Sequence, residues 1–320
     1  MITILSLTNP ISFLARLASL TAAVFAFAIA SVANAQQSFK APEEAVDALV
    51  SAAKIGDRKA VLTVLGRDGA DIVSSGDAIA DASARNRVIE AYDAKHQVVM
   101  EGTDKAALII GREDWPFPIP LVRKDNTWRF DTAAGREEIL YRRIGRNELS
   151  AVQACLAYVD AQQEYAEQGV AGNGVYAQRI VSRPGKKDGL YWPAQSGADE
   201  SPLGELAASA AAEGYRVGQQ HAPYHGYYYK VLTRQGPNAP GGALDYIVRG
   251  KMIGGFALVA YPAEYRNSGV MTFLVNHQGN VYEKDLGPNT ASITTGMTAF
   301  NPDKTWRRVT DAAQPPTGAR

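Results

Sequence analysis

The sequence predicts an α+β protein with two halves, each built from helices and an antiparallel sheet. Helical periodicity dominates up to about residue 95, and short runs with strand-like alternation follow it. A long helical stretch then separates this first half from a second set of alternating runs. The roughly 285 residues after an N-terminal leader exceed what one hydrophobic core usually organises, so two domains are expected.

The leader covers residues 1–35 and has the features of a secretory signal peptide. An apolar run at residues 17–32 follows the basic residue Arg16, and small residues at 33–35 suit a cleavage point. We therefore expect cleavage after Ala35 and a periplasmic mature protein with no membrane span. No cysteine directly follows the apolar run, so no lipid anchor is expected.

Charge and cysteine content exclude several classes of partner. Lys plus Arg and Asp plus Glu number 33 each, so neither nucleic acid nor an anionic membrane is expected as the main partner. The single cysteine, Cys155, has no partner for an internal disulfide. It shares a helical stripe with Val152, Leu156 and Val159, which predicts a buried core position. No motif marks a cofactor site.

Three helices are expected in the first half. Pro42 lies at a first helical position, and Glu43 and Glu44 lie in the first turn, where the helix dipole favours negative charge. The second helix is expected to end at Gly66. Asp77 is the expected N-cap of a third helix, which runs to about Lys95.

Four strand-like runs follow these helices. Prolines in DWPFPIP predict an edge strand, because proline cannot donate to a central ladder. Turn signals separate the runs, which together predict a curved antiparallel sheet around the helices. The runs are HQVVMEG, KAALIIG, FPIPLVRK and TWRF.

The element order of residues 36–133, with the closing DNTWRFD hairpin, resembles the cone-shaped fold of the nuclear transport factor 2 superfamily. The resemblance implies an enzyme or a ligand carrier with its site inside the cone. Asp114 and Tyr92 are the nearest counterparts of the inward Asp or Tyr that enzymatic members use. A capped surface turn is the alternative role for Asp114.

Helical periodicity returns at residues 134–168, with Gly145 as a candidate break, and this element is expected to bridge the halves. The glycine-rich segment GVAGNGVY follows it. That segment lacks the Lys-Ser/Thr ending of a phosphate-binding loop. Further along, ADESPLGELAASAAAEGY predicts a helix with Ser201 as N-cap and Pro202 at the first position.

The sheet of the second half is expected within residues 169–310. Period-two alternation occurs in GYYYKVL, FALVAY, VMTFLVN and NVYEK. FALVAY is apolar on both sides, which predicts a central strand covered on both faces. His277-Gln278-Gly279 predicts the turn before the last of these strands. A flexible tail is expected at residues 311–320.

The second half resembles the globular part of type IV pilin-like proteins. The resemblance rests on AQQEY followed by a glycine-bearing loop, and then on HGYYYKVL, GGFALVAYPAEYRNSG and VMTFLVNHQGNVYEKD. Assembling pilins carry a long apolar segment at the start of this helix, whereas a folded domain precedes it here. The resemblance therefore implies a soluble pilin-like module and not a pilus subunit.

Nearly the whole mature chain resembles an uncharacterised bacterial family, domain of unknown function 2950. The most distinctive runs are GYYYKVLTRQGPNAPGGALDYIVRGKMIGGFALVAYPAEY and GVMTFLVNHQGNVYEKDLG. The family resemblance implies no particular activity.

Histidine and serine patterns are the candidates for catalysis in this sequence. His221 and His225 are four residues apart and, with His277, offer a candidate zinc site. Pro223 disfavours the helix that would place both rings on one side, so we favour turns and a strand entry for these histidines. No Gly-x-Ser-x-Gly elbow occurs, and Ser196 lies in a polar loop without a nearby histidine.

The function that these patterns favour is a non-enzymatic binding or envelope-assembly module. Its candidate surface comprises Tyr224, His225, Tyr228 and His277, with an envelope protein, a glycan or a peptide as partner. The loop GPNAPGGALDY is rich in Gly and Pro, as recognition loops often are. Two alternatives are a periplasmic hydrolase or metal-dependent enzyme that uses the three histidines, and a small-ligand carrier that uses the N-terminal cone.

Overall fold

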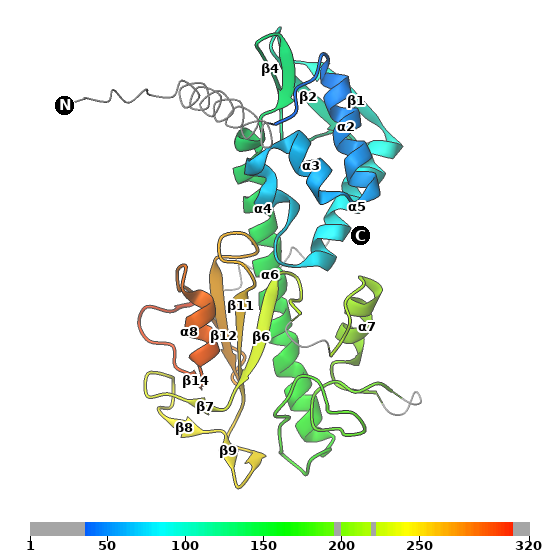
Figure 1. Cartoon of the computed structure of the whole chain (residues 1–320). Helices are drawn as coiled ribbons and strands as arrows, with labels where there is room; N and C mark the ends of the chain where they lie inside the picture. Colours follow the sequence, from blue (N-terminus) through cyan, green and yellow to red (C-terminus); the bar gives the residue numbers. More distant parts are fainter. Residues whose placement is uncertain (1–35, 195–199, 219–221, 310–320) are drawn as a thin grey trace, which may run out of the picture.

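The computed structural model describes residues 36–194, 200–218 and 222–309. Two halves lie at opposite ends of an elongated molecule, and helix α6 (Thr132–Glu167) runs through both (Figure 1). Its 36 residues span about 54 Å at 1.5 Å per residue. The expected break at Gly145 was wrong, because this exposed glycine lies within one continuous helix. The α+β class is confirmed.

The three helices predicted for the N-terminal half are present, whereas a 3-10 turn and a short helix between the second and the third were not predicted. Pro42 occupies a first helical position, and the Asp57 carboxylate accepts the Ala60 N–H at 3.0 Å. Asp77 caps the last helix through the N–H groups of Ile79 and Ala80. The elements are α2 (Pro42–Ile55), α3 (Arg58–Leu65), η1 (Arg67–Gly69), α4 (Ala70–Val73) and α5 (Ala78–Ala94).

The antiparallel sheet of this half has the strand order β1-β2-β4-β5, with β3 also paired to β2. Its buried side chains, such as Leu108 and Phe130, share one core with Val46 and Leu49 of α2. β3 is only two residues long, in agreement with the edge strand that the prolines predicted. The strands are β1 (His96–Met100), β2 (Lys105–Ile110), β3 (Trp115–Pro116), β4 (Leu121–Lys124) and β5 (Thr127–Phe130).

The main sheet of the C-terminal half is antiparallel, in the order β15-β13-β12-β11-β6. Helix α6 packs on one face and α8 (Thr290–Gly296) on the other, which buries β11 on both faces as predicted (Figure 1). Lys230 of β6 faces α8 and donates to the Thr294 carbonyl at 2.6 Å. The strands are β6 (Tyr227–Leu232), β11 (Ala257–Pro262), β12 (Met271–Asn276), β13 (Val281–Asp285) and β15 (Arg307–Arg308).

A smaller sheet lies beyond the end of β6 and has the order β14-β7-β8. β14 is parallel to β7, and β8 is antiparallel to it. These strands were not predicted, because two residues are too few to show a period. They are β7 (Arg234–Gln235), β8 (Leu244–Asp245) and β14 (Ala299–Phe300); the hairpin of β9 (Ile247–Val248) and β10 (Lys251–Met252) lies nearby.

Helix α7 (Gly204–Ala212) begins two residues later than predicted. The Ser201 carbonyl accepts the Gly204 N–H at 2.7 Å, so these residues form a turn ahead of the helix. Leu203 is the N-cap residue, and the predictions of a Ser201 cap and of Pro202 at the first position were wrong. Serine followed by proline is common both at a helix start and in a turn, so the residue types alone do not distinguish the two arrangements.

The two halves are also joined directly, beside α6. Arg143 of α6 donates to the carbonyls of Asp71 and Ile72 in the N-terminal half and to the side chain of Asn267 in the C-terminal half. Burial lowers the pKa of this guanidinium, which stays charged because the pKa of arginine is so high. Asn267 in turn donates to the Ser74 carbonyl at 2.8 Å. We call these contacts the junction.

Candidate functional site

Two of the predicted surface residues, Tyr224 and His225, lie together at the junction, just ahead of β6. Their ring centroids are 4.2 Å apart, and the ring of Tyr215 lies 5.0 Å from that of Tyr224. His225 Nε2 approaches the Glu213 carboxylate at 3.1 Å. His225 has a φ of 48°, and its N–H donates to the Tyr215 hydroxyl at 3.3 Å. This is a structured turn at a strand entry, as predicted.

Tyr228 does not belong to this group, because β6 turns its side chain to the opposite face. Its ring lies 5.6 Å from that of Tyr261 on the paired strand β11. Lys230, two residues further along, shares this face and contacts α8. Tyr224 and Tyr228 therefore lie on different sides of the sheet.

His277 lies at the far end of the sheet from His225. It directly follows β12, and its N–H donates to the Phe256 carbonyl at 3.1 Å. Its ring meets those of Phe256 and Tyr246 edge-on, and burial lowers the pKa of its imidazole. The six residues of β6 separate the two histidines by about 20 Å. They are too far apart to share a metal ion.

The proposed third metal ligand, His221, lies outside the described residues, as does Ser196. Within the described ranges, no group of three or more His, Cys, Asp or Glu side chains is placed to hold a metal ion. Cys155 is buried in the core, and burial raises the pKa of its thiol to about 12. Its predicted core role is confirmed.

Asp114 and Tyr92 of the N-terminal half do not form an internal site. Asp114 is at the surface, where its carboxylate pairs with Lys95 at 2.6 Å. Tyr92 is buried, stacks on His96 with centroids 3.7 Å apart, and donates to Asp47. A pocket of about 250 Å³ lies at the edge of this half, where Gln36 meets the end of β5 and the start of α6.

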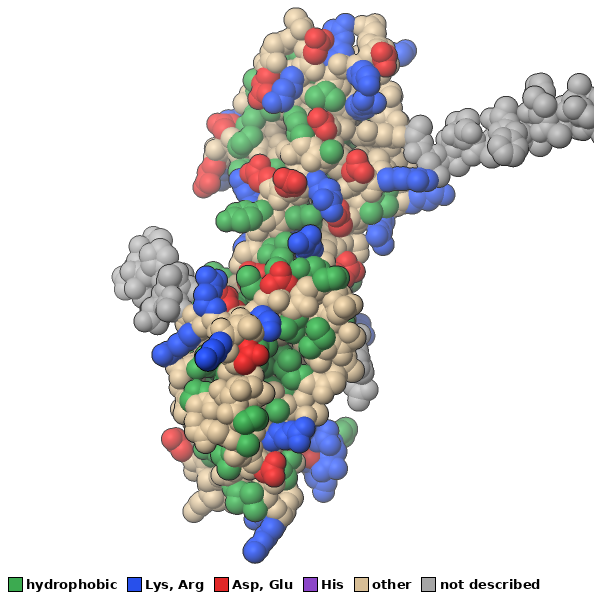
Figure 2. Space-filling model, turned by 90° about the vertical axis from the view of Figure 1, so that its left-hand side faces the viewer, with side chains coloured by type: hydrophobic (Ala, Val, Ile, Leu, Met, Phe, Trp, Pro, Cys, Tyr) green, Lys and Arg blue, Asp and Glu red, His purple; other side chains and the backbone are tan. Residues whose placement is uncertain are grey.

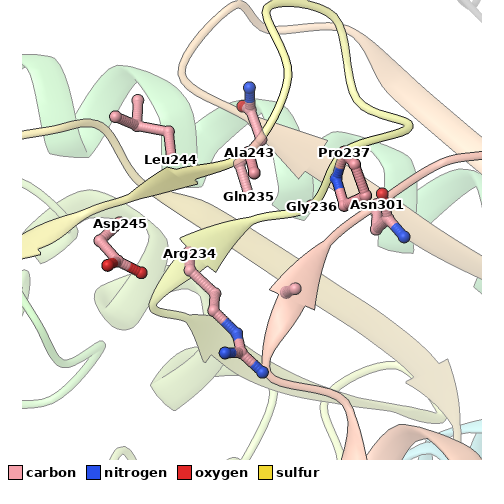
Figure 3. A pocket seen from close by; sticks show the side chains of 9 residues that line it. Arg234, Gln235, Gly236, Pro237, Ala243, Leu244, Asp245 and Asn301 are labelled. Carbon is pink, nitrogen blue, oxygen red and sulfur yellow. The ribbon is translucent and has the colours of Figure 1, made fainter.

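A larger pocket, of about 450 Å³, lies on the small sheet β14-β7-β8 and is shown in Figure 3. It includes the beginning of the loop at residues 236–242, which the sequence marked as a candidate recognition segment. We call it the β7–β8 pocket. Its lining residues are Arg234, Gln235, Gly236, Pro237, Ala243, Leu244, Asp245, Ala299 and Asn301.

Strand alternation explains why this surface is hollow. Arg234 pairs with Asp245 and with Ala299 in the register, so these three side chains share the outer face of the sheet. Alternation adds residues 236, 243 and 301 to that face. Small residues thus form the floor, and Arg234, Asp245 and Asn301 stand around it (Figure 3).

A buried hydrogen-bond network lies beneath the floor. Gln235 points inward and donates to the carbonyls of Pro240 at 2.9 Å and Gly242 at 2.8 Å. The buried Tyr246 hydroxyl donates to Gln235 Oε1 at 3.0 Å. Burial raises the pKa of Tyr246 to about 12, so this phenol remains a neutral donor at physiological pH. The network fixes the loop that borders the pocket.

The polar groups of the rim are positioned but only partly used. Arg234 donates to the Thr298 hydroxyl at 2.9 Å and points away from Asp245 (Figure 3). Among the described residues, no hydrogen bond or ion pair is made by the Asp245 carboxylate. Asn301 lies over Gly236, where a methyl group would come within 2.4 Å of it, and accepts the Asn238 N–H at 2.8 Å. The rim of the β7–β8 pocket therefore carries a cation (Arg234), an anion (Asp245) and an amide (Asn301).

Comparison with known families matches residues 36–309 to the family described as "Protein of unknown function (DUF2950)". The chain belongs to this family. The match covers both halves and α6, so DUF2950 comprises the whole architecture described above. No curated protein and no solved structure was found to match the chain. The resemblances to pilin-like and cone-shaped folds stay predictions.

The surface of this DUF2950 protein carries mixed charge. Basic and acidic side chains are interspersed over the visible face of both halves (Figure 2). In the described part of the chain, no helix combines the length and apolar character needed to cross a membrane.

Proposed function

We propose that this DUF2950 protein is an exported, periplasmic binding module and that the β7–β8 pocket takes a short peptide or the end of a peptide chain. The signal-peptide features of residues 1–35 support export. The pocket supports binding, because its floor is small and its rim is polar. Its residues supply hydrogen bonds and charges, in agreement with a role in recognition.

The observation that carries this proposal is the separation of Arg234 from Asp245 on neighbouring strands. Opposed charges on a sheet usually pair with each other, yet the guanidinium is held by Thr298. Arg234 is then available for a carboxylate, which guanidinium groups bind through two parallel hydrogen bonds. Asp245 is available for an ammonium or N–H group. A peptide backbone offers both, and its flat amides fit a floor of Gly236, Ala243 and Ala299.

Calorimetry with three matched peptides tests the proposal on the chain from residue 36 onward. The probes are trialanine, N-acetyl-trialanine and trialanine amide, which carry both terminal charges, only the carboxylate, or only the ammonium. Trialanine should bind most tightly. In the parent chain, losing either terminal charge should raise the dissociation constant about tenfold. Arg234→Gln should abolish the difference between trialanine and trialanine amide, and Asp245→Asn the difference between trialanine and N-acetyl-trialanine.

Arg112→Gln serves as the control, because Arg112 is an exposed arginine in the other half. It should leave binding unchanged. If no peptide binds, or if the Arg234 and Asp245 variants bind like the parent, the proposal is wrong. Binding of diacetylchitobiose in place of the peptides would also overturn it and would assign the pocket to a glycan.

A further inference from the structure

The two edges of the N-terminal sheet are treated differently. At the β5 edge, the chain covers the strand: Phe39 and Trp128 exchange backbone hydrogen bonds of 2.9 and 2.8 Å. At the other edge lies β1, and within the described residues only β2 pairs with it. An open edge strand is a ready template for a further strand.

The register shows which backbone groups of β1 are open. Glu101 donates to the Lys105 carbonyl, and the Lys95 carbonyl accepts the Gly111 N–H, both at 2.8 Å, so Lys95 and Glu101 direct their backbone groups toward β2. Alternation places Gln97 and Val99 in the same orientation. His96, Val98 and Met100 therefore present their N–H and C=O groups outward.

β1 lacks the usual protection of an edge strand. Natural sheets place charges, proline or bulges on open edges, whereas residues 96–100 read HQVVM and contain none of them. Met100 is 49% exposed and Val99 is 40% exposed. Charges occur only at the two flanks, with Lys95 before the strand and Glu101 after it.

This arrangement is self-complementary. If a second β1 lies antiparallel to the first with Val98 opposite Val98, each His96 faces a Met100, and their outward N–H and C=O groups pair. In the same register, Lys95 of each copy lies opposite Glu101 of the other. We infer that β1 binds β1 of a second copy of this chain, so that two N-terminal sheets form one continuous sheet.

The flanking charges have partners within their own chain, but these leave the proposed contact intact. Lys95 pairs with Asp114 at 2.6 Å, and Glu101 pairs with Lys105 at 3.1 Å. All four side chains are about half exposed, so these pairs are weak and rearrange readily. At each end of the proposed interface, the Lys95–Asp114 pair of one copy would lie beside the Glu101–Lys105 pair of the other.

Sedimentation velocity of the chain from residue 36 onward, over a range of concentrations, tests this inference. The parent chain should form a dimer at high concentration. Val98→Pro should weaken the dimer at least tenfold, because it removes an outward N–H while every ladder bond to β2 remains. Circular dichroism should show that the variant is folded.

Charge reversal gives a second, independent readout. Lys95→Glu should weaken the dimer by placing Glu opposite Glu101, and the double variant Lys95→Glu/Glu101→Lys should restore it, because the pair is recreated with opposite polarity. Lys124→Glu, an exposed reversal at the end of β4, should have no effect. A chain that stays monomeric, or a dimer that responds to neither Val98→Pro nor Lys95→Glu, would overturn the inference.

Discussion

The carboxylate of Asp77 accepts the backbone N–H of Gly226 at 2.8 Å, although 149 positions separate the two residues. The same oxygen accepts the Tyr215 hydroxyl at 2.9 Å, while the other oxygen caps α5. Gly226 has a φ of 75°, and a methyl group on it would lie 2.5 Å from Asn147, so only glycine fits this contact. One buried carboxylate thus caps a helix and holds the two halves together.

Asp77→Ala should lower the free energy of unfolding by about 2–4 kcal/mol, because it removes a cap and leaves the Gly226 N–H and the Tyr215 hydroxyl without an acceptor. Asp57→Ala is the matched control, since Asp57 is exposed and caps α3 through one N–H. Its cost should be about 1 kcal/mol. Urea unfolding measures both, and equal costs would show that the contacts of Asp77 with Gly226 and Tyr215 do not stabilise the fold.

Tyr246→Phe should destabilise the fold by about 1–2 kcal/mol, because the buried Gln235 Oε1 loses its donor. The loop at residues 236–242 should become more mobile, and trialanine should bind more weakly. Tyr265→Phe removes a comparable hydroxyl from an exposed bond to Asp285 and should cost little. Urea unfolding and calorimetry separate these outcomes, and identical behaviour of the two variants would contradict the role of the network.

His277 should make stability depend on pH. Burial lowers its pKa in the folded state, so the unfolded chain binds the proton more readily. Protonation of His277 therefore costs no stability above the ordinary histidine pKa of about 6.5. Below that pH the free energy of unfolding falls, and it keeps falling until the pH has passed the lowered pKa of the folded state. His277→Gln should reduce the loss of stability between pH 7 and pH 5 in paired unfolding experiments. An unchanged pH profile would show that the ring protonates without cost.

Gly145→Ala should stabilise the protein by about 0.5–1 kcal/mol, because glycine in a helix interior costs that much relative to alanine. Nothing lies within 4 Å of the added methyl group, so no repacking opposes the gain. The melting temperature should rise by about 2 °C. A decrease would mean that α6 needs a flexible point at this position, contrary to its regular path.

The sequence was informative where a residue type acts locally. Pro42 and Asp77 marked helix starts because capping depends on a few neighbouring atoms, and both predictions are confirmed. The six-residue strand β11 was long enough to show that both of its faces are apolar. Cys155 was assigned to the core from a helical stripe alone.

Other features depend on contacts between distant residues. The cap of Asp77 was predicted, but its contact with Gly226 has no local signature. The β7–β8 pocket arises from two-residue strands, and one of them comes from the far end of the chain. The composition of its loop predicted a recognition segment, but nothing in the sequence indicated the strand register that places Arg234 opposite Asp245. Tyr224 and Tyr228 were grouped by proximity in sequence, and a strand places them on opposite faces.

The path of α6 has a consequence for the ancestry of the chain. Its first turns lie against the N-terminal half, whereas Ala151, Cys155 and Tyr165 are part of the C-terminal core. The C-terminal half would lose the helical side of its core without α6, so recombination could move that half only together with this helix.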